Sequence, residues 1–176
     1  MLPFELVEGA IDLMVGIVRT EYNRRVDDVY AHYRDKSGAA AVDMPHLDEQ
    51  RIYISERYEP VQVPAVFIVP SISRRDLKTH DRNALIQSHD VVVTVLVEDL
   101  RLDALTRKTW RYALAMNNLF HERAERGPRG SSLVTLIQEI DYSPVYMQRV
   151  ADSNTRTYRK DASLRVAVRH GETFPG

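Results

Sequence analysis

The chain has 176 residues, of which 44% are hydrophobic and 28% are charged, and its 24 basic and 25 acidic residues leave a formal net charge of −1. This length and composition fit one globular domain over residues 1–176 with a core of its own. The near balance of charge argues against a dedicated nucleic-acid-binding protein, and the absence of cysteine excludes disulfides, thiolate nucleophiles and cysteine-based metal sites.

The N-terminal segment, from Pro3 to about Tyr30, is predicted to form a long helix. Apolar residues recur there at three- and four-residue spacing, at Phe4, Val7, Ile11, Met14 and Val18. Acidic residues interrupt the apolar run, so it does not have the pattern of a signal peptide. No stretch of the sequence reaches the roughly 20 apolar residues of a membrane span. We therefore expect a soluble protein, made in a cytoplasm, with no membrane partner.

Two glycines, Gly9 and Gly16, lie two turns apart in this predicted helix. Each lowers helix stability. Either a close approach of another backbone compensates for that cost, or the helix tolerates both residues. The sequence leaves these alternatives open.

Two long polar connections flank the next predicted strand. The first covers about 34–50, and long connections of this kind are often functional or flexible. A short strand is indicated by Ile52, Ile54 and Tyr58, and a firmer one by residues 61–70, where Pro64 favours a sheet edge or a strand start. The second connection, about 71–87, is predicted to be an extended hairpin that projects beyond the sheet.

Residues 88–126 predict a strand that runs directly into a long helix. Asp90 to Glu98 is rich in valine, which favours a strand. Carboxylates between Asp99 and Asp103 suit a helix start. A helical stripe then follows, formed by Leu105, Thr109, Tyr112, Ala113, Met116, Leu119 and Phe120.

The C-terminal part predicts two more strands, over 132–142 and 156–169, followed by a flexible tail at 171–176. The predicted order is therefore α-β-β-α-β-β. The simplest fold with that order is α+β, a mostly antiparallel four- to five-stranded sheet with two long helices packed on one face.

No recognised catalytic or ligand-binding signature is present. The glycines form neither GxGxxG nor GxxxxGK[ST], and GxSxG and HExxH are absent. The histidines share no metal-ligand spacing; they are His32, His46, His80, His89, His121 and His170. A cluster of Glu98, Asp99 and Asp103 could serve acid–base or metal chemistry, but helix capping explains the same residues. We expect no catalytic residue, no cofactor-binding residue and no metal site.

Two features indicate contacts with other molecules. Trp110 lies off the centre of the helical stripe, which favours a place at the edge of the sheet or at an interface, with core filling as the alternative. Arg74, Arg75, Lys78 and Arg82 make the second connection basic, so it is either a contact for phosphates or a solvated loop.

The element order and sequence texture resemble the tail-terminator and tail-completion (neck) proteins of long-tailed bacteriophages. The resemblance is carried by the N-terminal helix, by Val63 to Ile68, by Asp90 to Asp99 leading into Arg111 to Ala115, and by Tyr158 to Val168. It rests on these elements together and on no invariant motif.

The resemblance implies a non-enzymatic virion protein of the tail or neck, assembled in the host cytoplasm. Such a protein forms a homo-oligomeric ring, expected to be a hexamer, that caps the tail tube and joins it to the head connector. Its partners are its own copies, the major tail tube protein and connector proteins, and DNA only passes through the lumen. A near-neutral subunit suits that passage. The alternatives are a head-completion or connector ring protein and, with less support, a nucleic-acid-binding module.

Overall fold

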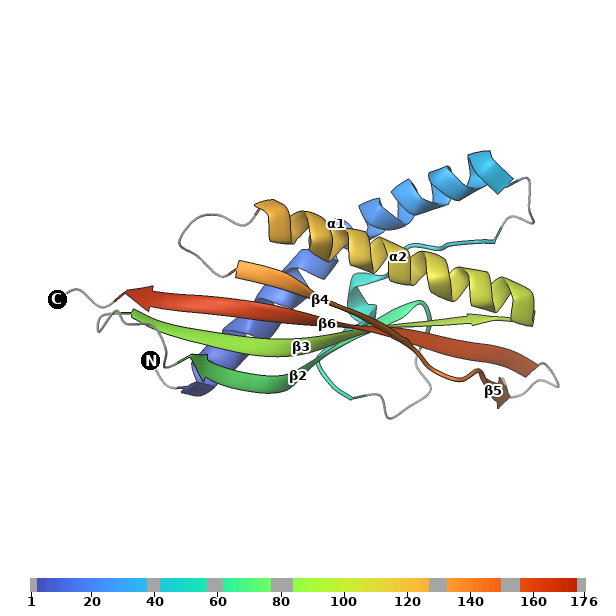
Figure 1. Cartoon of the computed structure of the whole chain (residues 1–176). Coiled ribbons are helices and arrows are strands. Elements are labelled where there is room, and N and C mark those ends of the chain that lie inside the picture. Colours follow the sequence, from blue (N-terminus) through green and yellow to red (C-terminus); the bar gives the residue numbers. More distant parts are fainter. Residues whose placement is uncertain are drawn as a thin grey trace.

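The computed structural model describes residues 3–37, 42–56, 62–76, 84–126, 133–149 and 156–173 (Figure 1). In chain order they form α1 (Pro3–Ser37), a 3₁₀ helix η1 (Glu49–Arg51), β1 (Ile52–Tyr53), β2 (Ala65–Asp76), β3 (Ala84–Asp99), α2 (Leu102–Arg126), β4 (Leu133–Tyr142), β5 (Tyr146–Arg149) and β6 (Arg156–Thr173).

The strands form one six-stranded sheet in the order β1-β2-β3-β6-β4, and β5 also pairs with β6. Every pairing is antiparallel except that of β1 with β2, which is parallel. The predicted α+β class is confirmed. The predicted four- to five-stranded sheet and the order α-β-β-α-β-β need correction: β5 is added, and the short strand indicated from Ile52 is present as β1, which pairs in parallel and makes the sheet mixed. The strand ends at Tyr53, before the Ile54 and Tyr58 that also indicated it.

Both long helices cover the same face of the sheet (Figure 1). There α2 packs on β3, β6 and β4, and α1 packs on α2 and β2. In β3 and β6 every second residue points into this layer, so that Val93 pairs with Leu164 and Val91 with Val166, all almost fully buried. This alternation is the period-two burial that the sequence predicts for both strands.

Part of the first long connection is ordered structure. The helix α1 continues to Ser37, beyond the predicted end, and residues 42–48 lie against the core with Met44 and Leu47 buried. We call residues 42–48 the strap. The side chain of Asn23 holds the strap by accepting a hydrogen bond from the Leu47 amide (2.7 Å) and donating one to its carbonyl (2.9 Å).

The second long connection is largely a strand hairpin, but its described part does not project beyond the sheet as predicted, because Ala84 to Gln87 also pair with β6. β2 and β3 stay paired from Ile72 with Asp90 to Asp76 with Ile86, and residues 77–83 lie outside the described part. At the other end of the chain β6 extends to Thr173, which pairs with Ala84. Residues 171–173, predicted as part of the flexible tail, are therefore strand, while 174–176 lie outside the described residues.

Candidate functional site

The histidines are scattered over the described part of the structure. His46 Nε2 lies 2.7 Å from Asp27 Oδ1 on the surface, His32 packs edge-on against Tyr33, and the buried His89 shares a hydrogen bond with Ser73 (2.8 Å). His80 and the side chain of His170 are outside the described part. Among the described residues no three histidine or acidic side chains gather as a group that could hold a metal ion.

The acidic cluster at the end of β3 is used for structure. Glu98 accepts a hydrogen bond from Arg159 Nε (3.0 Å). Asp99 accepts one from the Arg101 amide (3.1 Å) and lies 2.8 Å from Lys108 Nζ. Asp103 is exposed in the first turn of α2. Asp99 thus closes the turn that leads into α2; it bonds the amide of Arg101, the residue before the helix, and caps no amide of the first helical turn.

Opposing effects act on the pKa of Asp99. Burial raises it, but hydrogen bonds from Lys108 and the Arg101 amide, together with the positive charge of Lys108, outweigh burial and lower it below its ordinary value. The carboxylate is therefore held in its charged form and is a poor proton acceptor.

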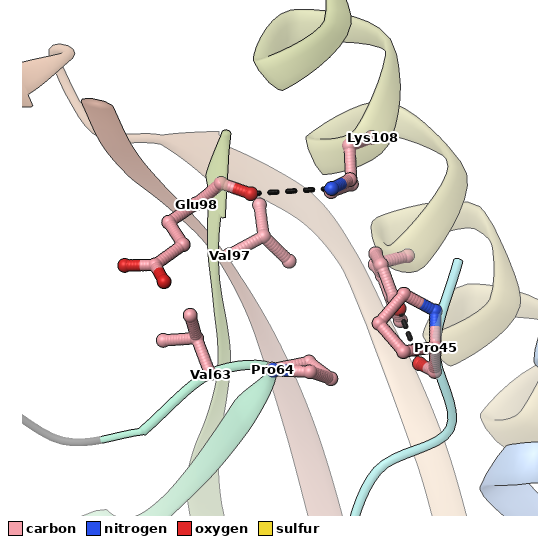
Figure 2. A pocket seen from close by; sticks show the side chains of 7 residues that line it. Pro45, Val63, Pro64, Val97, Glu98 and Lys108 are labelled. Carbon is pink, nitrogen blue, oxygen red and sulfur yellow. Dashed lines mark hydrogen bonds between the residues drawn. The ribbon is translucent and has the colours of Figure 1, made fainter. Parts of the chain in front are cut away.

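A small hollow of about 190 Å³ lies beside this turn, lined by Pro45, Val63, Pro64, Val97, Glu98, Lys108 and Tyr112 (Figure 2). The Lys108 ammonium donates to the Glu98 carbonyl (3.2 Å) and the Tyr112 hydroxyl donates to the Pro45 carbonyl. Burial raises the pKa of Tyr112. The polar groups of this hollow already serve the packing of α2 against the strap and the sheet, so the hollow is a junction between elements.

A second hollow, of about 350 Å³, opens between α1 and α2 and is lined by Tyr33, Arg107, Trp110 and Arg111. We call it the aromatic hollow. The Trp110 side chain is 54% exposed, so the interface alternative for this residue is favoured over core filling. Arg111 lies with its guanidinium carbon 4.7 Å from the centre of the Tyr33 ring. Sequence reasoning found Trp110 but missed Tyr33 and Arg111, which only the crossing of the two helices brings together.

A third feature is a group of exposed apolar side chains where β3 runs into α2. Across the sheet Asp99 pairs with Tyr158 and Tyr158 with Met147, so Met147 lies in the same row as Asp99, two strands away, and Leu100 comes directly after Asp99 in the chain. The exposed side chains are Leu100, Leu102, Val145 and Met147. We call this group the apolar end; in Figure 1 it is the end of the sheet that carries β5. Several exposed apolar side chains at one end of a subunit are a candidate for a contact site.

The sheet face opposite the helices is only partly covered. Ala65, Phe67 and Leu96 are buried there in a small second core, with the ring of Tyr53 stacked on Phe67. Next to it is a hollow of about 470 Å³, whose lining includes Val69, Val92 and Thr94. Among the described residues that line this hollow, Glu56 is the one charged side chain, so the hollow holds no charged cluster suited to catalysis.

The basic character predicted for 71–87 cannot be located on the surface. Arg74 and Arg75 are part of β2, but the positions of their side chains are outside the described structure, as are Lys78 and Arg82 altogether. The phosphate-contact hypothesis therefore stays a prediction. Of the helices in the described ranges, none contains a long enough uncharged apolar run to cross a bilayer.

Comparisons with known proteins give little beyond the geometry. No protein-family model matches the sequence, and no curated protein is similar to it. Among solved structures, a chain from the virion of a native gene transfer agent (GTA) particle matches with 14% identity over 80% of this chain and 91% of that chain, with a TM-score of 0.30. A TM-score of 0.30 does not establish a common fold.

Proposed function

We propose that this protein is a structural subunit of a phage-type virion. It assembles into a homo-oligomeric ring that caps the tail tube and joins it to the head connector, with DNA passing through the lumen. The observation that carries the proposal is the presence of separate contact surfaces on one small subunit, the apolar end and the aromatic hollow. The sequence resemblance to tail-terminator proteins points to the same role.

A closed ring requires a subunit with two different, complementary patches, because each copy contacts the next one head to tail. The aromatic hollow lies in the helix layer, whereas β1 is an edge strand at one end of the sheet. Patches placed so differently allow each copy to have a neighbour on either side.

Stacking of a ring on another ring requires a third surface. The apolar end supplies one, since Leu100 and Met147 are more than half exposed there. In an isolated subunit such side chains would contact water, and their burial against a tube or connector subunit would contribute about 25 cal/mol per Å² of apolar surface. We assign the apolar end to the tube or the connector.

The ring is tested by measuring the mass of the purified protein over a wide concentration range, with negative-stain images of the same samples. Rings with a central hole are the expected result, either spontaneously or after addition of tail tubes. A protein that stays monomeric at high concentration and does not bind tubes would contradict the proposal. Binding to connector rings in preference to tubes would identify a head-completion protein in place of a terminator.

The apolar end is tested separately by Met147→Lys. This exposed substitution leaves the core intact, so we expect rings to form but to lose their binding to tubes or connectors. Ile72→Lys is the matched control, because Ile72 is also exposed but lies in the β2–β3 hairpin.

A further inference from the structure

The aromatic hollow contains positive charge that the described part of the subunit does not neutralise. Arg111 is only 7% exposed, and its contact is with the face of the Tyr33 ring. Among the described residues neither Arg111 nor the exposed Arg107 forms an ion pair. A buried guanidinium beside a π face is stabilised only in part, and a carboxylate brought next to it would be strongly attracted. The hollow is therefore suited to an anionic group.

The wall of the hollow sets a second requirement for a ligand, which is an apolar part. Trp110 exposes about half of its side chain there, and tryptophan together with arginine is the combination enriched at the centres of protein interfaces. A matching ligand therefore combines an apolar side chain for the indole with a carboxylate for the two arginines.

One exposed segment of the same chain has this composition. Residues 54–56, Ile-Ser-Glu, directly follow the edge strand β1. Ile54 is 58% exposed, and Glu56 is exposed two positions later. Glu56 is opposite in charge to the two arginines of the hollow. The segment lies at the sheet edge and the hollow lies in the helix layer, so the two patches are separate on the surface.

We propose that the aromatic hollow of one copy binds residues 54–56 of the next copy, with Ile54 on Trp110 and the Glu56 carboxylate between Arg107 and Arg111. The inference rests on the proposed ring and names the contact that closes it. A carboxylate held by two guanidiniums forms charge-assisted hydrogen bonds with defined geometry. Because the two patches differ, the contact repeats head to tail and closes into a ring when the rotation allows.

Cysteine cross-linking tests the contact directly, because the chain has no cysteine of its own. Ser55→Cys places a thiol in the segment, and Thr106→Cys places one on α2 a turn before Trp110, where Thr106 is half-buried. Under mild oxidation the double variant should give a ladder of covalent oligomers that ends at the full ring, and the two single variants mixed together should give only dimers. Ser55→Cys combined with Thr20→Cys, an exposed position elsewhere on α1, should give no ladder.

A charge exchange provides the second test. Arg107→Glu should raise the concentration required for half-assembly by at least about tenfold, and adding Glu56→Arg in the same chain should restore most of the loss. Arg24→Glu, which reverses an exposed charge on α1, is the matched control and should leave assembly unchanged.

The outcomes separate this contact from the ring itself. If the unmodified protein forms rings but shows neither the ladder nor any response to Arg107→Glu, the contact is wrong and the ring stands. If Thr106→Cys alone cross-links efficiently to itself, α2 meets its own copy across a two-fold axis, which also overturns the contact. If the unmodified protein forms no ring even with tail tubes, both proposals fall.

Discussion

The hydroxyl of Tyr22 donates a hydrogen bond to the backbone carbonyl of Tyr112, 3.1 Å away, although 90 positions separate the two residues in the chain. Tyr112 in turn donates through its own hydroxyl to the carbonyl of Pro45. Two tyrosines thus join α1, α2 and the strap, and both are buried. The relative position of the two helices, and with it the shape of the aromatic hollow, depends on this junction.

Replacing Tyr22 by phenylalanine should lower the free energy of unfolding by about 1 kcal/mol at neutral pH, because one buried hydrogen bond is lost. Burial, and then the proximity of Tyr112, raise the pKa of Tyr22 well above its ordinary value. The contribution of the neutral Tyr22 hydroxyl to the free energy of unfolding is fully present at pH values below the unfolded-state pKa of about 10. It is lost as the pH rises above that value. Urea unfolding between pH 7 and 11 should show a smaller alkaline loss for Tyr22→Phe than for the unmodified protein. Equal losses would contradict the prediction.

Asn23→Ala should release the strap. The substitution removes the hydrogen bonds to both backbone groups of Leu47, which we expect to cost roughly 2 kcal/mol of unfolding free energy. The amide of Leu47 should then exchange hydrogen much faster. Asn118→Ala, at an exposed position of α2, is the control and should change stability by less than about 0.5 kcal/mol. Unchanged protection of Leu47 would show that the strap is held by its apolar residues alone.

Asp99→Asn should be destabilising only where the native carboxylate is charged. The folded-state pKa of Asp99 is lowered, so its contribution is present above the unfolded-state pKa of about 3.9 and is lost as the pH falls through the folded-state value. At pH 7 we expect a loss of about 1–2 kcal/mol, because Lys108 loses its carboxylate partner. The difference between the two proteins should shrink towards pH 2 in chemical denaturation, and a constant difference would argue against the charge interaction.

Gly9→Ala and Gly16→Ala should each stabilise the folded subunit. A methyl group added at either glycine meets no described atom within 4 Å, so the subunit gives no support to the close-approach alternative. Removing a helical glycine should add about 0.5–1 kcal/mol, measured as a higher midpoint of thermal unfolding. A stabilised subunit that no longer assembles would place this face of α1 at a contact between copies, whereas destabilisation would contradict the prediction.

The strands and helices with strong periodicity were predictable from the sequence. Valines at alternate positions of β3 pack against the matching residues of β6, and the stripe that includes Tyr112 and Phe120 forms the buried side of α2. In each of these elements the solvent-facing and core-facing positions alternate locally, so the pattern can be read without knowing the neighbours. The β2–β3 hairpin was predictable as the polar connection between two strands, but not its pairing with β6.

The strap, the parallel pairing of β1 and the extension of β6 were not predictable. Residues 42–48 have no regular period and are fixed by Asn23 and Tyr112, which are distant in the chain. The two residues of β1 become a strand only because β2 lies beside them, and Thr173 only because it meets Ala84. Such contacts depend on partners that local sequence does not specify.

By itself, the sequence determined the α+β class, the two long helices and the absence of cysteine chemistry, because composition and periodicity are properties of each segment alone. Only the tertiary structure decided which side chains meet on the surface. It placed Tyr33 under Arg111 beside Trp110, and Met147 in the same row of the sheet as Asp99, through the crossing of two helices and the register of three strands. A surface site is assembled from distant segments, and the packing that brings them together is a property of the whole chain.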